Sequence, residues 1–263
     1  MTSKTEPRLL CYDLGEGVTA FSTTRHGGVS EANYASFNIN PYCGDSADHV
    51  ARNRQLLADR LGLPASHIVL PHQVHGIEHR AVAPELLDMS DAVRDKILDG
   101  VDMVTTSMTG VCIGVSTADC IPVLLYDPVA RATAAIHAGW RGTLQRICQR
   151  AVMAMQLHYG TTPDRLRAVV GPGISLANFE VGQEVYDQFL QAGFDLTETA
   201  EWHTKWHLDL PGINIRELIG CGVTPEHIHH AGICTFDHAD DYFSVFFNDT
   251  ATTEIYTLLY TLS

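Results

Sequence analysis

Residues 120–143 read CIPVLLYDPVARATAAIHAGWRGT, in which two runs of mainly apolar residues flank a short polar segment. Asp127 followed by Pro128 favours the opening of a type I turn, so the two runs are predicted to be antiparallel strands of one hairpin. With the hairpin centred directly after Pro128, Cys120 lies opposite His137 on the same face, with Cα atoms about 4.5–5.5 Å apart. This stretch therefore predicts both a sheet and a pair of side chains that meet on it.

A thiolate and an imidazole at this spacing are typical zinc ligands. Pro122 weakens the register, because proline cannot donate to the ladder and favours a bulge that would shift the pairing by one residue. A third ligand is available in HQVHG, which contains His72 and His75. Three ligands leave one position open, as in catalytic zinc sites. The alternative is that Cys120 is an inert buried residue and that His137 lies near it by chance.

The rest of the chain mixes strand and helix patterns and predicts an α+β protein, with adjacent antiparallel strands early and helices inserted later. Runs rich in β-branched residues predict further strands at 17–24, 67–70, 102–107, 111–117, 165–171, 206–210, 227–233 and 242–247. Helical spacing predicts helices from Asp45 or Ser46 to Gly62, and at 143–160, 183–193 and 213–222.

Composition excludes several classes of protein. The 263 residues carry a formal net charge of −14, so a nucleic-acid partner or a polybasic membrane-binding patch is not expected. The N-terminus lacks an apolar stretch of signal-peptide length, and the longest apolar run is interrupted by Asp119 and Pro122. Seven cysteines without a C-x-x-C pair indicate a reduced, cytoplasmic protein.

A series of motifs occurs in an order that is very specific in combination: TTRHGGVS, NINPYCGD followed by NR, QVHG, TADCIPVLLYD, AAIHAGWRGT, GPGIS with FEVG, and GICTF. Between residues 23 and 243 they resemble the YfiH-like family, also called the laccase-domain or multicopper polyphenol oxidase family. The resemblance implies one domain over residues 1–263, with mixed β-sheets flanked by helices, similar to the catalytic domain of a bacterial toxin deamidase. It also implies a zinc site on His75, Cys120 and His137, with His72 a weaker candidate and copper a less favoured metal.

The family includes purine nucleoside phosphorylases that also act as adenosine deaminases and methylthioadenosine phosphorylases. The resemblance therefore implies purine nucleosides and phosphate as substrates, and leaves the oligomeric state open. Zinc lowers the pKa of a bound water, which would supply hydroxide for attack on C6 of adenosine. Asp119 is the candidate proton shuttle, and the alternative is an aspartate that satisfies backbone N–H groups.

Phosphorolysis also requires an anion site. Arg25, beside a pair of glycines, is the first candidate for holding phosphate, and Arg141 is the second. The alternative for Arg141 is a surface ion pair. Asn38 and Arg54 lie in the matched motifs and are expected to bind substrate. The candidate catalytic residues are Asp119, Cys120 and Arg141.

Two other enzymatic functions remain open. One is a peptidoglycan-editing amidase that acts on a muropeptide precursor, since a zinc-bound water suits amide hydrolysis equally well. The other is a copper-dependent polyphenol oxidase, which needs many more ordered histidines than one cysteine and two histidines. The dense histidine cluster at 227–230 lies far along the chain and is interpreted as a polar strand edge. A non-enzymatic zinc module is the least favoured.

The C-terminal stretch 246–263 departs from the family pattern. Phe246 and Phe247 stand where the family has a pair of arginines, and no lysine or arginine follows Arg216. FFNDTATTEIYTL resembles translated sequencing-adapter read-through, so this tail is not expected to be the natural end. Residues 255–258 still have strand propensity and are expected to form an edge strand.

Overall fold

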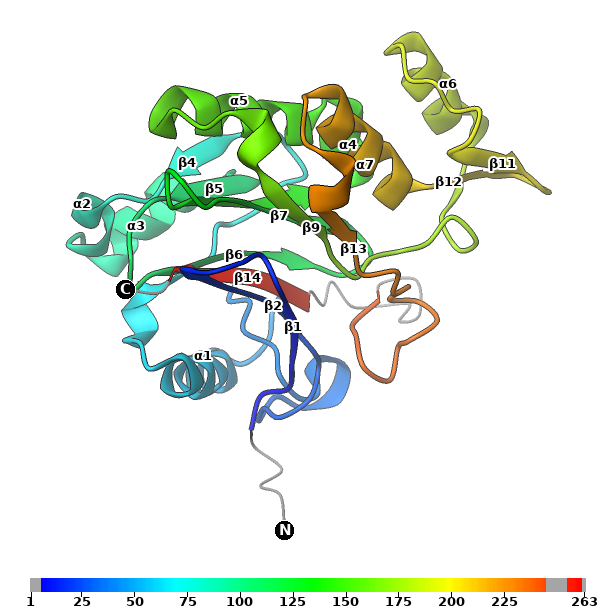
Figure 1. Ribbon diagram of the computed structural model, residues 1–263. Helices are drawn as coiled ribbons and strands as arrows, with labels where there is room; N and C mark the ends of the chain where they lie inside the picture. The colour runs from blue at the N-terminus through cyan, green and yellow to red at the C-terminus, as the bar shows by residue number, and fades with distance from the viewer. Residues whose placement is uncertain (1–5, 245–254, 262–263) are drawn as a thin grey trace.

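The predicted hairpin forms the centre of a six-stranded sheet in the computed structural model, which describes residues 6–244 and the backbone of 255–261 (Figure 1). β7 (Ile121–Asp127) pairs antiparallel with β8 (Ala132–Ala138). The strand order is β13-β9-β7-β8-β5-β4. The other members are β4 (His79–Ala81), β5 (Met103–Thr106), β9 (Arg167–Val170) and β13 (Ile228–His230).

A five-stranded sheet stacks against the first, and a small third sheet projects beside them (Figure 1). The five-stranded sheet has the order β1 (Leu9–Tyr12), β2 (Val18–Thr23), β14 (Ile255–Thr261), β6 (Cys112–Thr117) and β3 (Ile68–Val69). The small sheet contains β10 (Glu180–Val181), β12 (Trp206–Leu208) and β11 (Ala200–Trp202), and α6 (Gln183–Gln191) lies next to it.

Helices cover the outer faces of the two stacked sheets. α4 (Trp140–Leu144), α5 (Ile147–Tyr159) and α7 (Leu210–Gly220) lie over the six-stranded sheet, whereas α1 (Ala47–Leu61) lies under the other (Figure 1). α2 (Pro84–Leu87) and α3 (Asp91–Leu98) lie on the connection from β4 to β5. The predicted α+β class is thus confirmed. No helix in the described part of the chain combines the length and hydropathy needed to cross a membrane.

Alternation along β7 explains the layering. Val123 and Leu125 pack under the helices, while Leu124 and Tyr126 pack between the two sheets. All four side chains are fully or almost fully buried. Because both faces of β7 are buried, neither face needs polar side chains, and the sequence of the strand is an almost continuous apolar run.

The predicted register of the hairpin is wrong by two residues. His137 lies opposite Pro122 rather than Cys120, and pairing continues without a bulge from Ile121 to Asp127. The cause is a longer turn over residues 128–131, in which Asp127 Oδ1 accepts the backbone N–H groups of two turn residues and Arg131 adopts a left-handed φ of 52°. A shift by an even number leaves each side chain on its predicted face.

Four other expectations need correction. The single helix expected at 143–160 is divided into α4 and α5, because Arg146 has a left-handed φ of 61°. β6, expected beside its sequence neighbours, belongs to the other sheet. Residues 242–244 are not in a strand, and the rest of that predicted strand, including Phe246 and Phe247, lies outside the described residues. β14 is not an edge strand but pairs with β2 and β6 on its two sides.

Candidate metal centre

His75, Cys120 and His137 converge at one end of the six-stranded sheet. One ligand atom from each side chain lies within 4.8 Å of the other two. His75 comes from the loop after β3, Cys120 from the turn before β7, and His137 from the end of β8. Within the described ranges, these three residues form the single group of three or more histidine, cysteine or carboxylate side chains that could hold a metal ion. Two imidazoles and one thiolate are a donor set that suits zinc.

His137 is held from both its backbone and its ring. The side chain is 1% exposed, and its Nδ1 lies 2.7 Å from Oδ1 of Asp102. The backbone N–H of His137 also donates to the backbone carbonyl of Asp102 at 2.9 Å. Asp102 was not singled out by sequence analysis, because one aspartate before a strand has no local pattern that would indicate a partner 35 positions away.

The QVHG motif forms a tightly anchored loop. The Gln73 side chain donates to the backbone carbonyl of Ser116 in β6 and accepts the Ser116 backbone N–H, both at 2.7 Å. These are the two hydrogen bonds that a neighbouring strand would otherwise form with Ser116. His75 has a left-handed φ of 62°. Its N–H donates to Oδ1 of Asp102 at 2.9 Å, and the N–H of Gly76 donates to Oδ2 at 2.8 Å. The backbone that carries His75 is therefore fixed at several points.

Cys120 follows a sharp turn at Asp119, which has a left-handed φ of 78°. The Asp119 carbonyl accepts the N–H of Ile174 at 2.8 Å, so the GPGIS segment lies directly on this turn. Gly173 is required by that approach, because a Cβ there would lie 3.1 Å from the Asp119 and Cys120 carbonyl oxygens and 2.5 Å from an Ile121 methyl group.

The electrostatics of the cluster favour a cysteine thiolate. Burial raises the pKa of the Cys120 thiol, but the His137 and His75 imidazoles outweigh this effect and lower the pKa to about 7. Burial lowers the pKa of His137, but Cys120 and Asp102 raise it to about 10. For Asp102, burial opposes ionisation, yet the hydrogen bonds from His137 and the loop N–H groups leave the pKa below its usual value. The thiolate is the form in which cysteine binds a metal.

A pocket of about 410 Å³ opens beside the three side chains. Its other walls come from the turn before β7, the start of α4, the loop after β9, the segment around β10 and α6, and the start of α7. These walls include Asp119, Trp140, Arg141, Ile174, Phe179, Glu180, Val181, Val185 and Leu210. The volume and the largely apolar lining are typical of a small-molecule site.

Asp119 and Arg141, which were expected to be catalytic, both line this pocket. The Asp119 side chain is 3% exposed, and its two carboxylate oxygens accept the hydroxyls of Thr235 at 2.6 Å and Ser244 at 3.0 Å. Arg141 is exposed, and its guanidinium lies 4.4 Å from the centre of the Trp140 ring. Their catalytic roles stay predictions.

Arg25 is not among the residues that line the metal pocket. Its guanidinium donates to the backbone carbonyls of Ala35 at 2.9 Å and Ala239 at 2.7 Å, and it lies over the Phe243 ring. Burial lowers its pKa from the usual value. Arg25 therefore links two loops, and a contact with phosphate stays a prediction.

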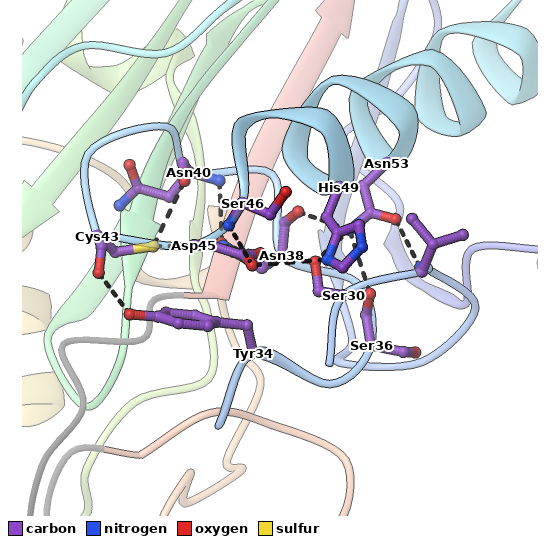
Figure 2. A network of polar contacts seen from close by, with 11 residues as sticks. Ser30, Tyr34, Ser36, Asn38, Asn40, Cys43, Asp45, Ser46, His49 and Asn53 are labelled. Atoms are coloured by element: carbon purple, nitrogen blue, oxygen red, sulfur yellow. Dashed lines mark hydrogen bonds and ion pairs between the residues drawn. The ribbon is translucent and has the colours of Figure 1, made fainter. Parts of the chain in front are cut away.

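Asn38 belongs to a buried network of loop contacts rather than to the lining of the metal pocket (Figure 2). Its amide nitrogen donates to Asp45 at 2.9 Å, and its backbone carbonyl accepts from Asn53 at 2.7 Å. Arg54 donates to the Ile68 carbonyl at 2.7 Å and lines a different pocket of about 540 Å³ between α1 and α3. Substrate binding by Asn38 or Arg54 stays a prediction.

His72 lies outside the group of three candidate ligands. Its Nδ1 lies 2.6 Å from Oδ1 of Asp99, and its ring stacks on Tyr42. The histidines at 229 and 230 lie in β13, an edge strand of the six-stranded sheet, and are exposed, as their interpretation as a polar strand edge predicts; His227 directly precedes this strand.

Comparison with known proteins identifies relatives over most of the chain. The family model described as "Multi-copper polyphenol oxidoreductase laccase" matches residues 19–259. A purine nucleoside phosphorylase of Bacteroides thetaiotaomicron is 42% identical over 230 residues, which cover 86% of this chain and 85% of that protein. Adenosine deaminase RL5, from an unknown prokaryotic organism, is 37% identical over 233 residues, covering 87% and 88%.

Solved structures agree with the fold. The hypothetical protein YfiH of Bacillus licheniformis superposes with a TM-score of 0.86 at 28% identity, covering 94% of this chain and 93% of that one. YlmD from Geobacillus stearothermophilus also gives a TM-score of 0.86 at 28% identity, with coverages of 96% and 94%.

Proposed function

This chain belongs to the multi-copper polyphenol oxidoreductase laccase family, and on that premise we propose that it is a zinc-dependent purine nucleoside phosphorylase that also deaminates adenosine and cleaves methylthioadenosine. The relatives that carry the names purine nucleoside phosphorylase and adenosine deaminase support an enzyme of this kind. The seven free cysteines are consistent with a reducing, cytoplasmic location.

The observation that carries the proposal is the open cluster of His75, Cys120 and His137 beside the pocket of about 410 Å³. A structural zinc site is closed by four protein ligands, whereas a catalytic site keeps one position for water or substrate. A zinc ion bound here would act as a Lewis acid and lower the pKa of water. The pocket has the volume of a site for a small molecule such as a nucleoside.

We assign proton transfer, phosphate binding and purine packing to other residues that line the pocket. In this proposal Asp119 accepts and returns a proton; its carboxylate lines the pocket beside Cys120 and accepts hydrogen bonds from two hydroxyl groups, which supports this role. Arg141, exposed at the same pocket, supplies positive charge for phosphate. Trp140 and Phe179 offer aromatic faces against which a purine ring can pack.

The donor set argues for zinc rather than for a multicopper centre. Multicopper chemistry requires several clusters of histidines, and the residues that the structure describes contain one candidate group. A single group with one thiolate matches zinc chemistry.

The test is to purify the protein, measure its metal content, and assay adenosine, inosine and methylthioadenosine with and without phosphate. We expect stoichiometric zinc, phosphate-dependent release of the purine base, and phosphate-independent release of ammonia from adenosine. Cys120→Ala should lose both metal and turnover. Cys148→Ala, a buried free cysteine outside the metal group, is the matched control and should keep both.

A muropeptide amide is included as an additional substrate. Bound zinc with turnover of this amide, and without turnover of any nucleoside, would replace the proposal by the peptidoglycan-editing amidase. Turnover of phenols with bound copper would replace it by the polyphenol oxidase.

A further inference from the structure

One buried carboxylate contacts both segments that carry the histidine ligands. Oδ1 of Asp102 lies 2.7 Å from Nδ1 of His137 and accepts the backbone N–H of His75 at 2.9 Å. Oδ2 receives the backbone N–H groups of Gly76 at 2.8 Å and Val74 at 3.2 Å. Three successive N–H groups therefore wrap around the same carboxylate that holds the ring of His137, in an arrangement of the anion-nest type.

We infer that Asp102 is a positioning residue that presets His75 and His137 for one zinc ion, an inference that rests on the proposed zinc-dependent function. The contact with His137 fixes which ring nitrogen is presented to the metal. A carboxylate oxygen accepts hydrogen bonds, so Nδ1 keeps its proton and Nε2 is the nitrogen that loses its proton when the metal binds. Carboxylate partners of this kind fix the tautomer and orientation of metal-bound histidines.

The contacts with the loop fix where the second histidine lies. His75 has a left-handed φ of 62°, a conformation that non-glycine residues adopt uncommonly and that the surrounding structure holds in place. The N–H bonds from residues 74 to 76 to Asp102 supply that constraint on the segment that bears the imidazole. Because Asp102 is 0% exposed, water cannot replace it in these contacts.

The same loop contains a matched control. His72 Nδ1 contacts Oδ1 of Asp99 at 2.6 Å, which repeats the aspartate–histidine geometry. The His72 and Asp99 side chains are 41% and 66% exposed, whereas those of His137 and Asp102 are 1% and 0% exposed. Asp99→Asn thus makes the same chemical change at an aspartate–histidine pair that holds no candidate ligand.

The experiment compares Asp102→Asn, Asp99→Asn and the wild type by competition for Zn²⁺ with a chromophoric chelator. Asparagine keeps the shape of the side chain, but its NH₂ group would face N–H donors. We expect Asp102→Asn to bind Zn²⁺ about 10- to 100-fold more weakly, as is typical for the loss of such a partner, and Asp99→Asn to bind it as the wild type does. The absorption spectrum of the Co²⁺-loaded protein should also change in Asp102→Asn alone.

Unchanged Zn²⁺ affinity in Asp102→Asn, or an equal loss in Asp99→Asn, would overturn the inference. If Asp102→Asn does not fold, ¹H–¹⁵N spectra of the Zn²⁺-loaded wild type decide. A proton retained on Nδ1 of His137 supports the inference, and a metal-bound Nδ1 overturns it. Zn²⁺ binding is measured without substrate, so absence of nucleoside turnover with normal Zn²⁺ binding would affect only the proposed function.

Discussion

Gly139 lies directly against the three candidate ligands, and replacing it by alanine is expected to weaken metal binding. A Cβ at this position would lie 3.0 Å from Sγ of Cys120, 3.1 Å from Cδ2 of His75 and 3.8 Å from Cε1 of His137. The backbone itself accepts alanine, because φ is −68° and ψ is 168°. The added methyl group is therefore the main source of strain.

The size of the effect follows from these distances. The first two contacts are a few tenths of an ångström shorter than ordinary van der Waals contacts, so the Cys120 and His75 side chains must move away from residue 139. Zinc–ligand distances tolerate changes of about ±0.2 Å. Overpacking of a tight site costs about 1–3 kcal/mol. Because about 1.4 kcal/mol corresponds to a tenfold change in affinity, the Zn²⁺ affinity of Gly139→Ala should fall roughly 10- to 100-fold.

The assay is competition for Zn²⁺ against a chelator, with thermal unfolding of the metal-free protein measured in parallel. Gly139 is also the N-cap of α4, where alanine is a poor residue. Gly139→Ser separates the two effects, since serine restores a good N-cap but retains the Cβ. Gly220→Ala, whose Cβ would meet nothing within 4 Å, is the control for a glycine replacement alone. Normal Zn²⁺ affinity in Gly139→Ala, or recovery of affinity in Gly139→Ser, would refute the crowding argument.

Three further predictions concern different parts of the molecule. In the metal-free protein, the rate of Cys120 alkylation, followed by mass spectrometry, should rise with pH with a midpoint of about 7 rather than 9, because the neighbouring imidazoles lower the pKa of the thiol and the thiolate is the reactive form. Bound Zn²⁺ should abolish the reaction, and a midpoint near 9 would contradict the lowered pKa. Arg141→Ala should raise the KM for phosphate and change the free energy of unfolding little. Arg25→Ala should lower the free energy of unfolding by about 1–3 kcal/mol, because it leaves two carbonyl acceptors without their donor. A raised KM for phosphate in Arg25→Ala with unchanged stability would make Arg25 the phosphate ligand. Deletion of residues 255–263 should prevent cooperative unfolding in circular dichroism melts, because β14 separates β2 from β6, and an unchanged melt would show that the five-stranded sheet closes without it.

The hairpin shows how far local sequence signals reach. Apolar runs and the Asp127–Pro128 pair identify two strands and where the turn begins, and both are confirmed. They do not give the length of the turn, because the left-handed conformation of Arg131 has no sequence signature comparable to that of glycine. The register was therefore wrong by two residues. Cys120 and His137 still meet because strand faces repeat every two residues.

Long-range pairing was less accessible from the sequence. Strand propensity identified residues 255–258 as extended, but propensity is local and cannot place a strand within a sheet. Asp102 shows the same limit within the candidate site, since its partners lie 26 to 28 positions before it and 35 positions after it. The family resemblance of the motifs taken together located the candidate ligands. The residue that joins two of them is recognisable only after folding.

The candidate ligands and part of the pocket wall come from different parts of this fold. His75, Cys120 and His137 all come from loops or strand ends of the stacked sheets. The opposite wall of the pocket comes from β10 and α6, which belong to the small projecting sheet region and supply none of the three ligands (Figure 1). Changes in that wall can alter the shape of the pocket while the contacts of Asp102 with both histidine segments remain intact. The geometry of the candidate metal site is thus set by the two stacked sheets, whereas part of the pocket wall comes from the small third sheet and the helix next to it.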